Sequence, residues 1–158
     1  MHRIIYFIVE ADTPDYAVTK AEDDLRELVA TKTVDYGTFF DDESSESSGP
    51  KRWGKKQIAI KLNTDEGKKK LLSLLRTDYK EFLKNIQEIR RSIQENTNDE
   101  IYDDNVDSFY FTAAGERRWL YDGYSGVQNC LEITYILHYY QEQNTLDNVW
   151  LVPCDVHT

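Results

Sequence analysis

The chain opens on an apolar run at residues 3–9, Arg3-Ile4-Ile5-Tyr6-Phe7-Ile8-Val9. Successive side chains of a strand point to opposite faces of a sheet, and here both alternating sets of positions are apolar. A strand that is covered on both faces has this pattern, so the run predicts a central strand with a layer packed on each side. The segment Asn148–Pro153 is apolar on both faces too and predicts a second strand of this kind.

A helix is expected directly after the first strand. Thr13 is a suitable N-cap and Pro14 suits the first helical position. Apolar side chains then recur at helical spacing, which predicts a helix from Pro14 to Thr31. The segment Val34–Phe40 predicts the next strand, so the first forty residues form a β-α-β unit.

A second β-α-β unit is expected from residue 57 onward. The segment Gln57–Leu62 alternates between apolar and polar residues and predicts a strand with one buried face. The strongest periodic signal in the chain follows it, at spacings of 4, 4, 3, 4, 3 and 4, in Leu71, Leu75, Tyr79, Phe82, Ile86, Ile89 and Ile93. This pattern predicts a helix from Asp65 to Glu95, about 46 Å long at 1.5 Å per residue. A domain of this size is only about 30 Å across, which is shorter than the expected helix. Either the helix breaks near Thr77, or one of its ends extends beyond the body of the domain.

The remaining segments complete the predicted order. Asp41–Pro50 is rich in acidic residues and serine with no large apolar side chain, and it predicts an exposed, mobile loop. Phe109–Phe111 predicts a short strand, Gly115–Gly126 a turn-rich connection, and Gly126–Glu142 a last helix. The chain is therefore expected to form one α+β domain over residues 1–158, with a ferredoxin-like β-α-β-β-α-β core, a C-terminal α-β extension and one long amphipathic helix.

Bulk composition favours a globular protein. The 158 residues are 40% hydrophobic and 13% aromatic, with a formal net charge of −10. The chain holds no apolar run long enough to span a membrane, so no membrane partner is expected. It holds only two cysteines, Cys130 and Cys154, which favours free thiols in a cytoplasmic protein and leaves a single disulfide open.

The charge is unevenly distributed along the chain. Residues 51–91 carry 13 basic and 5 acidic side chains, whereas the segments before and after them have net charges of −8 and −10. On a helical wheel, five of the basic residues fall on one arc nearly opposite the apolar stripe: Lys69, Arg76, Lys80, Lys84 and Arg91. This arc predicts either a contact surface for an anionic partner or a solvated face that the acidic segments neutralise.

A second unusual stretch reads Arg117-Arg118-Trp119-Leu120-Tyr121-Asp122-Gly123-Tyr124. Arginine, tryptophan and tyrosine are enriched at binding hot spots, so Arg117, Arg118, Trp119, Tyr121 and Tyr124 are candidate binding residues. A packed loop whose aromatic side chains cover the core is the alternative.

The C-terminal run Asp155-Val156-His157 places a carboxylate and an imidazole on one side of a strand, with Cys154 pointing to the other. His2 lies close to them if the first and last strands are neighbours. Such a cluster could support acid–base or nucleophilic chemistry. The three histidines have no metal-site spacing, and no glycine-rich phosphate loop or nucleophile elbow is present, so no cofactor or metal is expected.

The run Val152-Pro153-Cys154-Asp155-Val156-His157 and the opening strand with Glu10-Ala11 resemble small uncharacterised proteins of halophilic archaea or their viruses. The resemblance covers only the two ends of the chain and implies no activity.

These observations predict a non-catalytic binding or assembly module that acts through the long helix and the Arg/aromatic stretch. A homodimer built partly on the distal half of the helix, Phe82–Ile93, is expected, and a protein partner is possible. Two alternatives remain open. One is a nucleic-acid-associated regulator that uses the basic arc, although the net charge of −10 opposes binding to a polyanion. The other is a small enzyme that uses the C-terminal Asp/His cluster.

Overall fold

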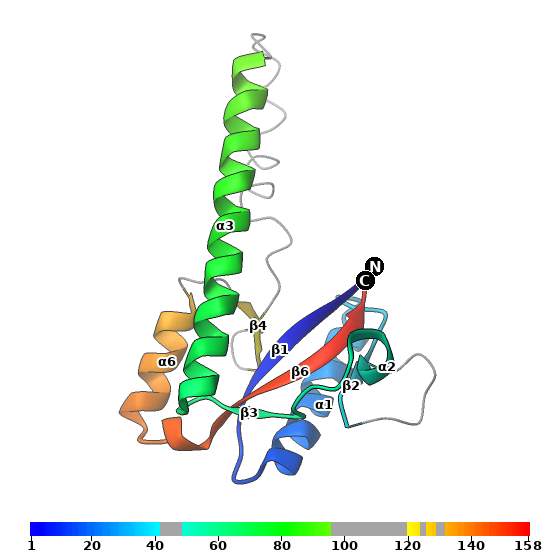
Figure 1. The fold of residues 1–158 in the computed structure, drawn as a ribbon, viewed down its shortest axis with the longest axis vertical. Coiled ribbons are helices and arrows are strands. Elements are labelled where there is room, and N and C mark those ends of the chain that lie inside the picture. The colour runs from blue at the N-terminus through cyan, green and yellow to red at the C-terminus, as the bar shows by residue number, and fades with distance from the viewer. Residues whose placement is uncertain (42–48, 96–119, 124–125, 129–131) are drawn as a thin grey trace.

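A computed structural model of the chain describes residues 1–41, 49–95, 120–123, 126–128 and 132–158. Within them, the protein is an α+β structure built on an open, mixed sheet with helices on both sides (Figure 1). None of the described helices combines the length and hydropathy that a membrane-spanning helix needs.

Two long strands form the centre of the sheet. β1 (His2–Glu10) pairs antiparallel with β6 (Val149–His157) along its whole length, from His2 opposite His157 to Glu10 opposite Val149. β2 (Tyr36–Phe39) and the two-residue β3 (Ile60–Lys61) both pair with β6, while β4 (Leu120–Asp122) runs parallel to β1 and pairs with β5 (Gly126–Gln128). The main strand order is therefore β2-β6-β1-β4-β5.

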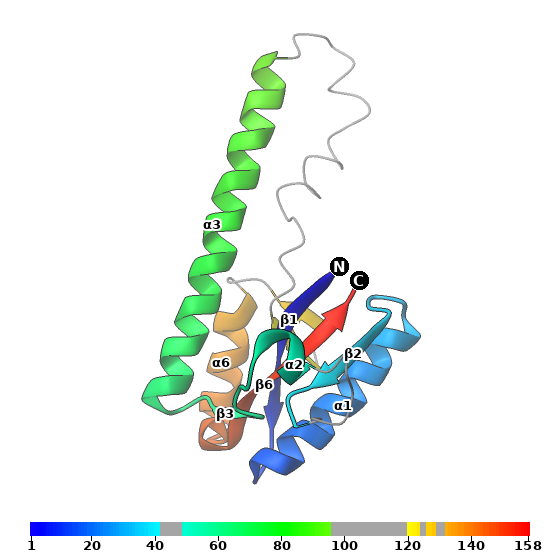
Figure 2. The same cartoon turned by 45° about the vertical axis from the view of Figure 1, so that its right-hand side comes forward.

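The helices form a layer on each face of the sheet. Figure 2 shows α1 (Pro14–Ala30) on one side, and α3 (Asp65–Glu95) with α6 (Glu132–Glu142) on the other. Ile5, Phe7 and Val9 of β1 belong to the core under α1, whereas Tyr6 and Ile8 belong to the core under α3 and α6. The prediction that this strand is buried on both faces is confirmed.

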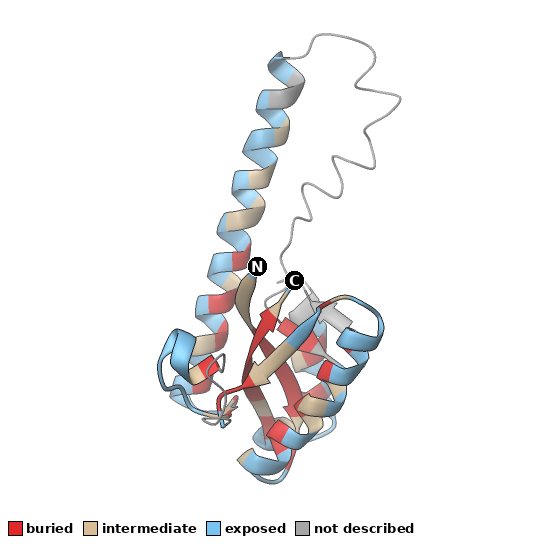
Figure 3. Cartoon of the chain, turned by 90° about the vertical axis from the view of Figure 1, so that its right-hand side faces the viewer, coloured by how far each residue is buried: buried red, intermediate tan, exposed pale blue. Residues whose placement is uncertain are grey.

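The long elements agree with the sequence prediction. α1 begins at Pro14, and the Oγ1 atom of its N-cap Thr13 accepts a hydrogen bond from the Tyr16 amide. α3 runs unbroken over its 31 residues, so the alternative of a break near Thr77 is wrong. Figure 3 shows buried residues only on the turns of α3 beside the sheet, while the distal turns extend beyond it.

Several short elements differ from the prediction. Residues 120–122 were expected in a turn-rich connection but form β4, and residues 126–128 were expected in a helix but form β5. A strand of three residues has no measurable periodicity, and these two exist because neighbouring strands supply their hydrogen bonds. The predicted strand Gln57–Leu62 shortens to β3, and the last strand continues past Pro153 to His157.

The predicted loop Asp41–Pro50 is wrong at its C-terminal end. Gly49 and Pro50 start α2 (Gly49–Trp53), and Gly49 is buried against the Phe40 ring. Residues 42–48 lie outside the described part of the chain. The predicted strand Phe109–Phe111 lies outside it too, and the described strands do not confirm the ferredoxin-like order.

Candidate functional site

The proximal half of α3 is fixed firmly to the sheet. The Thr64 hydroxyl accepts a hydrogen bond from the Gly67 amide at 3.1 Å and donates one to the Lys61 carbonyl at 2.7 Å, which joins the helix start to β3. Leu71 and Leu74 are buried in the core under the helix. The Lys70 ammonium lies 4.6 Å from the centre of the Tyr6 ring, a favourable cation–π contact. The outward side chains of these turns are therefore held on a rigid support.

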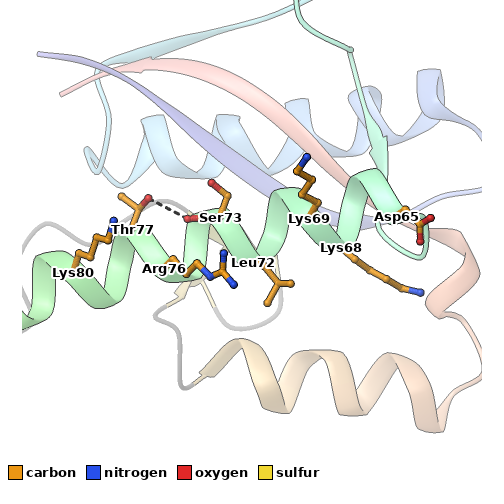
Figure 4. Close-up of a pocket in the computed structure, with 8 residues that line it drawn as sticks. All are labelled: Asp65, Lys68, Lys69, Leu72, Ser73, Arg76, Thr77 and Lys80. Atoms are coloured by element: carbon orange, nitrogen blue, oxygen red, sulfur yellow. Dashed lines mark hydrogen bonds between the residues drawn. The ribbon is translucent and has the colours of Figure 1, made fainter.

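A surface hollow of about 520 Å³ lies along the outer side of these turns (Figure 4). Four basic side chains line it, and we call them the basic surface: Lys68, Lys69, Arg76 and Lys80. The exposed Leu72 lies among them, Asp65 lines one end, and the Thr77 hydroxyl donates to the Ser73 carbonyl at 3.0 Å. The hollow therefore combines positive charge with one apolar side chain.

The structure divides the five cations that the sequence selected. Lys69, Arg76 and Lys80 line the hollow and, within the described residues, make no ion pair. Lys84 instead lies 3.7 Å from the Glu88 carboxylate, and Arg91 lies 3.9 Å from that of Glu95. Both pairs are four residues apart on one helix, where ion pairs of this kind form. Unpaired positive charge is thus concentrated toward the body of the protein.

Of the predicted Arg/aromatic binding residues, Tyr121 lies in the described part of the chain. Arg117, Arg118, Trp119 and Tyr124 lie outside the described part of the chain. Tyr121 is 4% exposed on β4, and its ring packs edge-on against Phe7 with centroids 5.3 Å apart. Its side chain therefore belongs to the core under α1, which matches the packed alternative for this residue.

A second group of polar side chains meets where β1, β2, α2 and β6 come together. We call it the terminal cluster: His2, Tyr36, Arg52, Asp155 and His157. The His2 Nδ1 atom lies 3.3 Å from Asp155 Oδ1, and its Nε2 atom lies 3.3 Å from the Tyr36 hydroxyl. The Arg52 guanidinium donates to the other oxygen of Asp155. The proximity of His2 to Asp155 and His157 that the sequence suggested is confirmed, whereas Arg52 and Tyr36 were missed.

The terminal cluster is an interlocked network. The His157 ring stacks on the Tyr36 ring with centroids 5.2 Å apart, and its Nδ1 atom lies 2.8 Å from Asp35 Oδ2. Asp155 is 1% exposed, and a buried carboxylate requires partners of this kind. Because Arg52 comes from α2, its bond to Asp155 holds that short helix against the sheet. In the described part of the chain, no three His, Cys, Asp or Glu side chains are grouped so that they could hold a metal ion.

Cys154 lies beside this cluster but faces the opposite side of the sheet. Its thiol is fully buried in the core under α1 and is not part of a disulfide. Burial raises the pKa of the Cys154 thiol well above its usual value, and the nearby charge of Asp155 raises the pKa further. The thiol therefore stays protonated, which does not suit a nucleophile.

This protonation state gives a pH prediction. The unfolded thiol ionises above about pH 8.5, whereas the folded thiol does not, so its contribution to stability is present below that pH and is lost as the pH rises. At pH 10, the wild type should lose about 2 kcal/mol of unfolding free energy beyond the loss in Cys154→Ala. Urea unfolding at pH 7 and pH 10 measures the difference. Equal losses in both proteins would show that the thiol reaches solvent in the folded state.

The fold and the geometry define an α+β protein with a charged helical surface and a buried polar network. Over residues 1–158 the chain matches the model of DUF7995, a domain of unknown function, and it belongs to that family. The match carries no assigned activity and no link to archaeal or viral proteins. No curated protein and no solved structure matches the chain.

Proposed function

We propose that this protein is a non-catalytic binding module that holds an anionic protein partner on the basic surface of α3. The observation that carries the proposal is the concentration of four basic side chains, none ion-paired within the described residues, around one hollow. Lys84 and Arg91 each have an acid four residues further along the helix, whereas Arg76 and Lys80 have none four residues away on either side.

The arrangement has an energetic cost that a partner would offset. Arg76 and Lys80 are like charges four residues apart, a spacing that destabilises a helix by a few tenths of a kcal/mol. A cluster of one sign also raises the local potential, which attracts a partner of opposite sign and speeds its association. Leu72 supplies apolar area within the same hollow, so contact there need not rest on charge alone.

Nucleic acid is the competing anionic partner. The basic surface would suit phosphates, but the rest of the chain is strongly acidic and the net charge is −10. Long-range repulsion therefore opposes approach to a polymer that carries one charge per about 1.7 Å. A short acidic protein segment meets less of this repulsion because it need not extend past the basic surface.

Charge reversal tests the proposal. The variant Lys69→Glu/Arg76→Glu/Lys80→Glu should weaken binding to a polyglutamate peptide at least tenfold at about 50 mM salt, where electrostatic contacts are strong. The control Lys32→Glu/Lys51→Glu/Lys56→Glu changes the net charge equally, from −10 to −16, at exposed sites away from the hollow. It should change binding less than threefold. Fluorescence anisotropy of labelled peptide provides the measurement.

Three results would overturn the proposal. The first is that the wild type does not bind polyglutamate, and the second is that the charge reversal and the control weaken its binding equally. The third is tighter binding to a DNA duplex than to a polyglutamate of equal charge at the same salt concentration, which would favour the nucleic-acid-associated regulator.

A further inference from the structure

A continuous stripe of exposed side chains follows α3 beside the basic surface. Its members are spaced 4, 3, 4, 3 and 4 residues apart, and we call them the outer seam: Leu72, Arg76, Tyr79, Leu83, Ile86 and Arg90. The four apolar members are 52%, 55%, 41% and 41% exposed in chain order. An ordinary protein surface exposes large apolar side chains singly and at scattered positions, whereas here four of them lie in one line along the helix.

The outer seam is separate from the side of α3 that packs on the sheet. Leu71 and Leu74 point into the core, and Asp78 is buried on the same side. At about 100° per residue, the outer seam lies roughly a quarter-turn away from that buried side. The core therefore uses one stripe of the helix, and the described structure leaves the second stripe uncovered over about 27 Å.

The spacing of the outer seam indicates what shape fits it. The five steps from Leu72 to Arg90 span 18 residues, an average of 3.6, which keeps the stripe in line along a straight helix. Alternating steps of 4 and 3 are also the spacing at which the side chains of two helices meet when they pack side by side. Apolar side chains on such a stripe insert between those of the facing helix. Arg76 and Arg90 flank the three central apolar members, which suits a partner stripe that offers both apolar contact and carboxylates, because arginine binds carboxylates with paired hydrogen bonds.

Charge indicates which helix fits. Lys69 and Lys80, which make no ion pair within the described residues, flank one side of the outer seam, and Arg76 and Arg90 lie within it. A second copy of α3 packed in antiparallel orientation would bring these cations against their counterparts. A helix with acidic residues beside its apolar stripe would face them with opposite charge instead.

We propose that the outer seam is the docking site for an acidic amphipathic helix of a partner protein, packed along α3 in the manner of a coiled coil. This inference rests on the proposed function, because the basic surface supplies the charge that selects the partner. It adds that the partner is helical and that apolar contacts along the outer seam contribute to affinity.

Synthetic peptides test the inference. The probe is a 21-residue peptide with leucine at the two core positions of each heptad and glutamate beside them, and the matched control peptide carries lysine in place of glutamate. The acidic peptide should bind the wild type and gain helical circular dichroism on binding, whereas the basic peptide should not bind. Leu83→Ser/Ile86→Ser should weaken acidic-peptide binding at least tenfold. The control Val29→Ser removes an apolar side chain of similar exposure, 38%, from α1 on the other face of the sheet, and it should change binding less than threefold.

The outcomes separate this inference from the proposed function. If Leu83→Ser/Ile86→Ser leaves peptide affinity unchanged while the charge reversal still weakens polyglutamate binding, the inference fails and the proposed function stands. If the charge reversal has no effect on either ligand, both fail. A dimeric mass by light scattering at micromolar concentration, lost in Leu83→Ser/Ile86→Ser, would overturn the inference because a second copy would then cover the outer seam.

Discussion

Replacing Asp155 with alanine is expected to destabilise the folded protein by about 3 kcal/mol. The carboxylate is 1% exposed, and both of its oxygens are used, one by His2 and the other by Arg52. Its removal leaves the Arg52 guanidinium beside a buried site without a counter-charge. Breaking a buried ion pair from one side costs about 3–5 kcal/mol, and the lower end applies because the Arg52 side chain is 30% exposed and can turn toward water.

The chain offers a matched control for this substitution. Asp23 forms an ion pair with Arg26 in which the two side chains are 68% and 73% exposed. Asp23→Ala should therefore cost less than about 0.5 kcal/mol, as for other surface pairs. Urea unfolding of both variants gives the two free energies. A loss below 1 kcal/mol for Asp155→Ala would show that the terminal cluster does not hold α2 on the sheet.

A double-mutant cycle assigns the effect to its partner. Arg52→Met leaves the Asp155 carboxylate buried with His2 as its remaining partner, so this variant should also be strongly destabilised. The variant Arg52→Met/Asp155→Ala removes both charges and should lose less than the sum of the two single losses, with a coupling of about 2 kcal/mol. Strict additivity would mean that Arg52 and Asp155 do not act as a pair.

The sequence predicted the elements whose pattern is long. β1, α1, α3 and β6 are each at least nine residues long, so their apolar pattern identifies them. The pattern places the ends of α1 and α3 to within one residue, whereas the predicted end of β6 at Pro153 falls four residues short. α2, β4 and β5 contain five, three and three residues and were missed. Their stability comes from neighbours distant in sequence, such as Asp155 for α2 and β1 for β4, which no local pattern contains.

The candidate surface could be predicted in outline but not in its detail. Helical geometry alone places Lys69, Arg76 and Lys80 on one arc, because the position of each side chain around the axis follows from its number. Which apolar residues face the core depends on how far the sheet extends beneath the helix. Tyr79 and Ile86 belong to the apolar periodicity that predicts the helix, with Ile86 in the half expected to form a homodimer, and they are 55% and 41% exposed. The outer seam therefore emerges only from the three-dimensional structure.

The terminal cluster, too, could be predicted only in part, because most of its contacts depend on how separate elements pack. Asp155 and His157 share one side of β6, and this follows from strand alternation. His2 reaches Asp155 only because β1 and β6 are neighbouring strands, and the sequence pattern does not show which strands pair. Arg52 and Tyr36 come from α2 and β2, so their approach depends on the packing of four separate elements.

Replacing Gly67 with alanine should also cost about 3 kcal/mol, although alanine is the better helix former. Gly67 lies in the first turn of α3, where the helix crosses close to the strand before it. A Cβ atom there would lie 2.1 Å from the Lys61 carbonyl oxygen and 2.7 Å from that of Leu62. Both are backbone atoms, so no side-chain rotation relieves the overlap, and the start of α3 must shift away from β3.

Gly54 supplies the contrasting control. Its φ of 78° lies in the left-handed region, but a Cβ atom there would meet nothing within 4 Å. Gly54→Ala should therefore cost only about 1 kcal/mol, from backbone strain alone. Because the start of α3 orients the basic surface and the outer seam, Gly67→Ala should also weaken acidic-peptide binding under conditions where the variant remains folded. Equal stability losses for the two glycine variants would contradict the close approach of α3 to β3 that holds both surfaces in place.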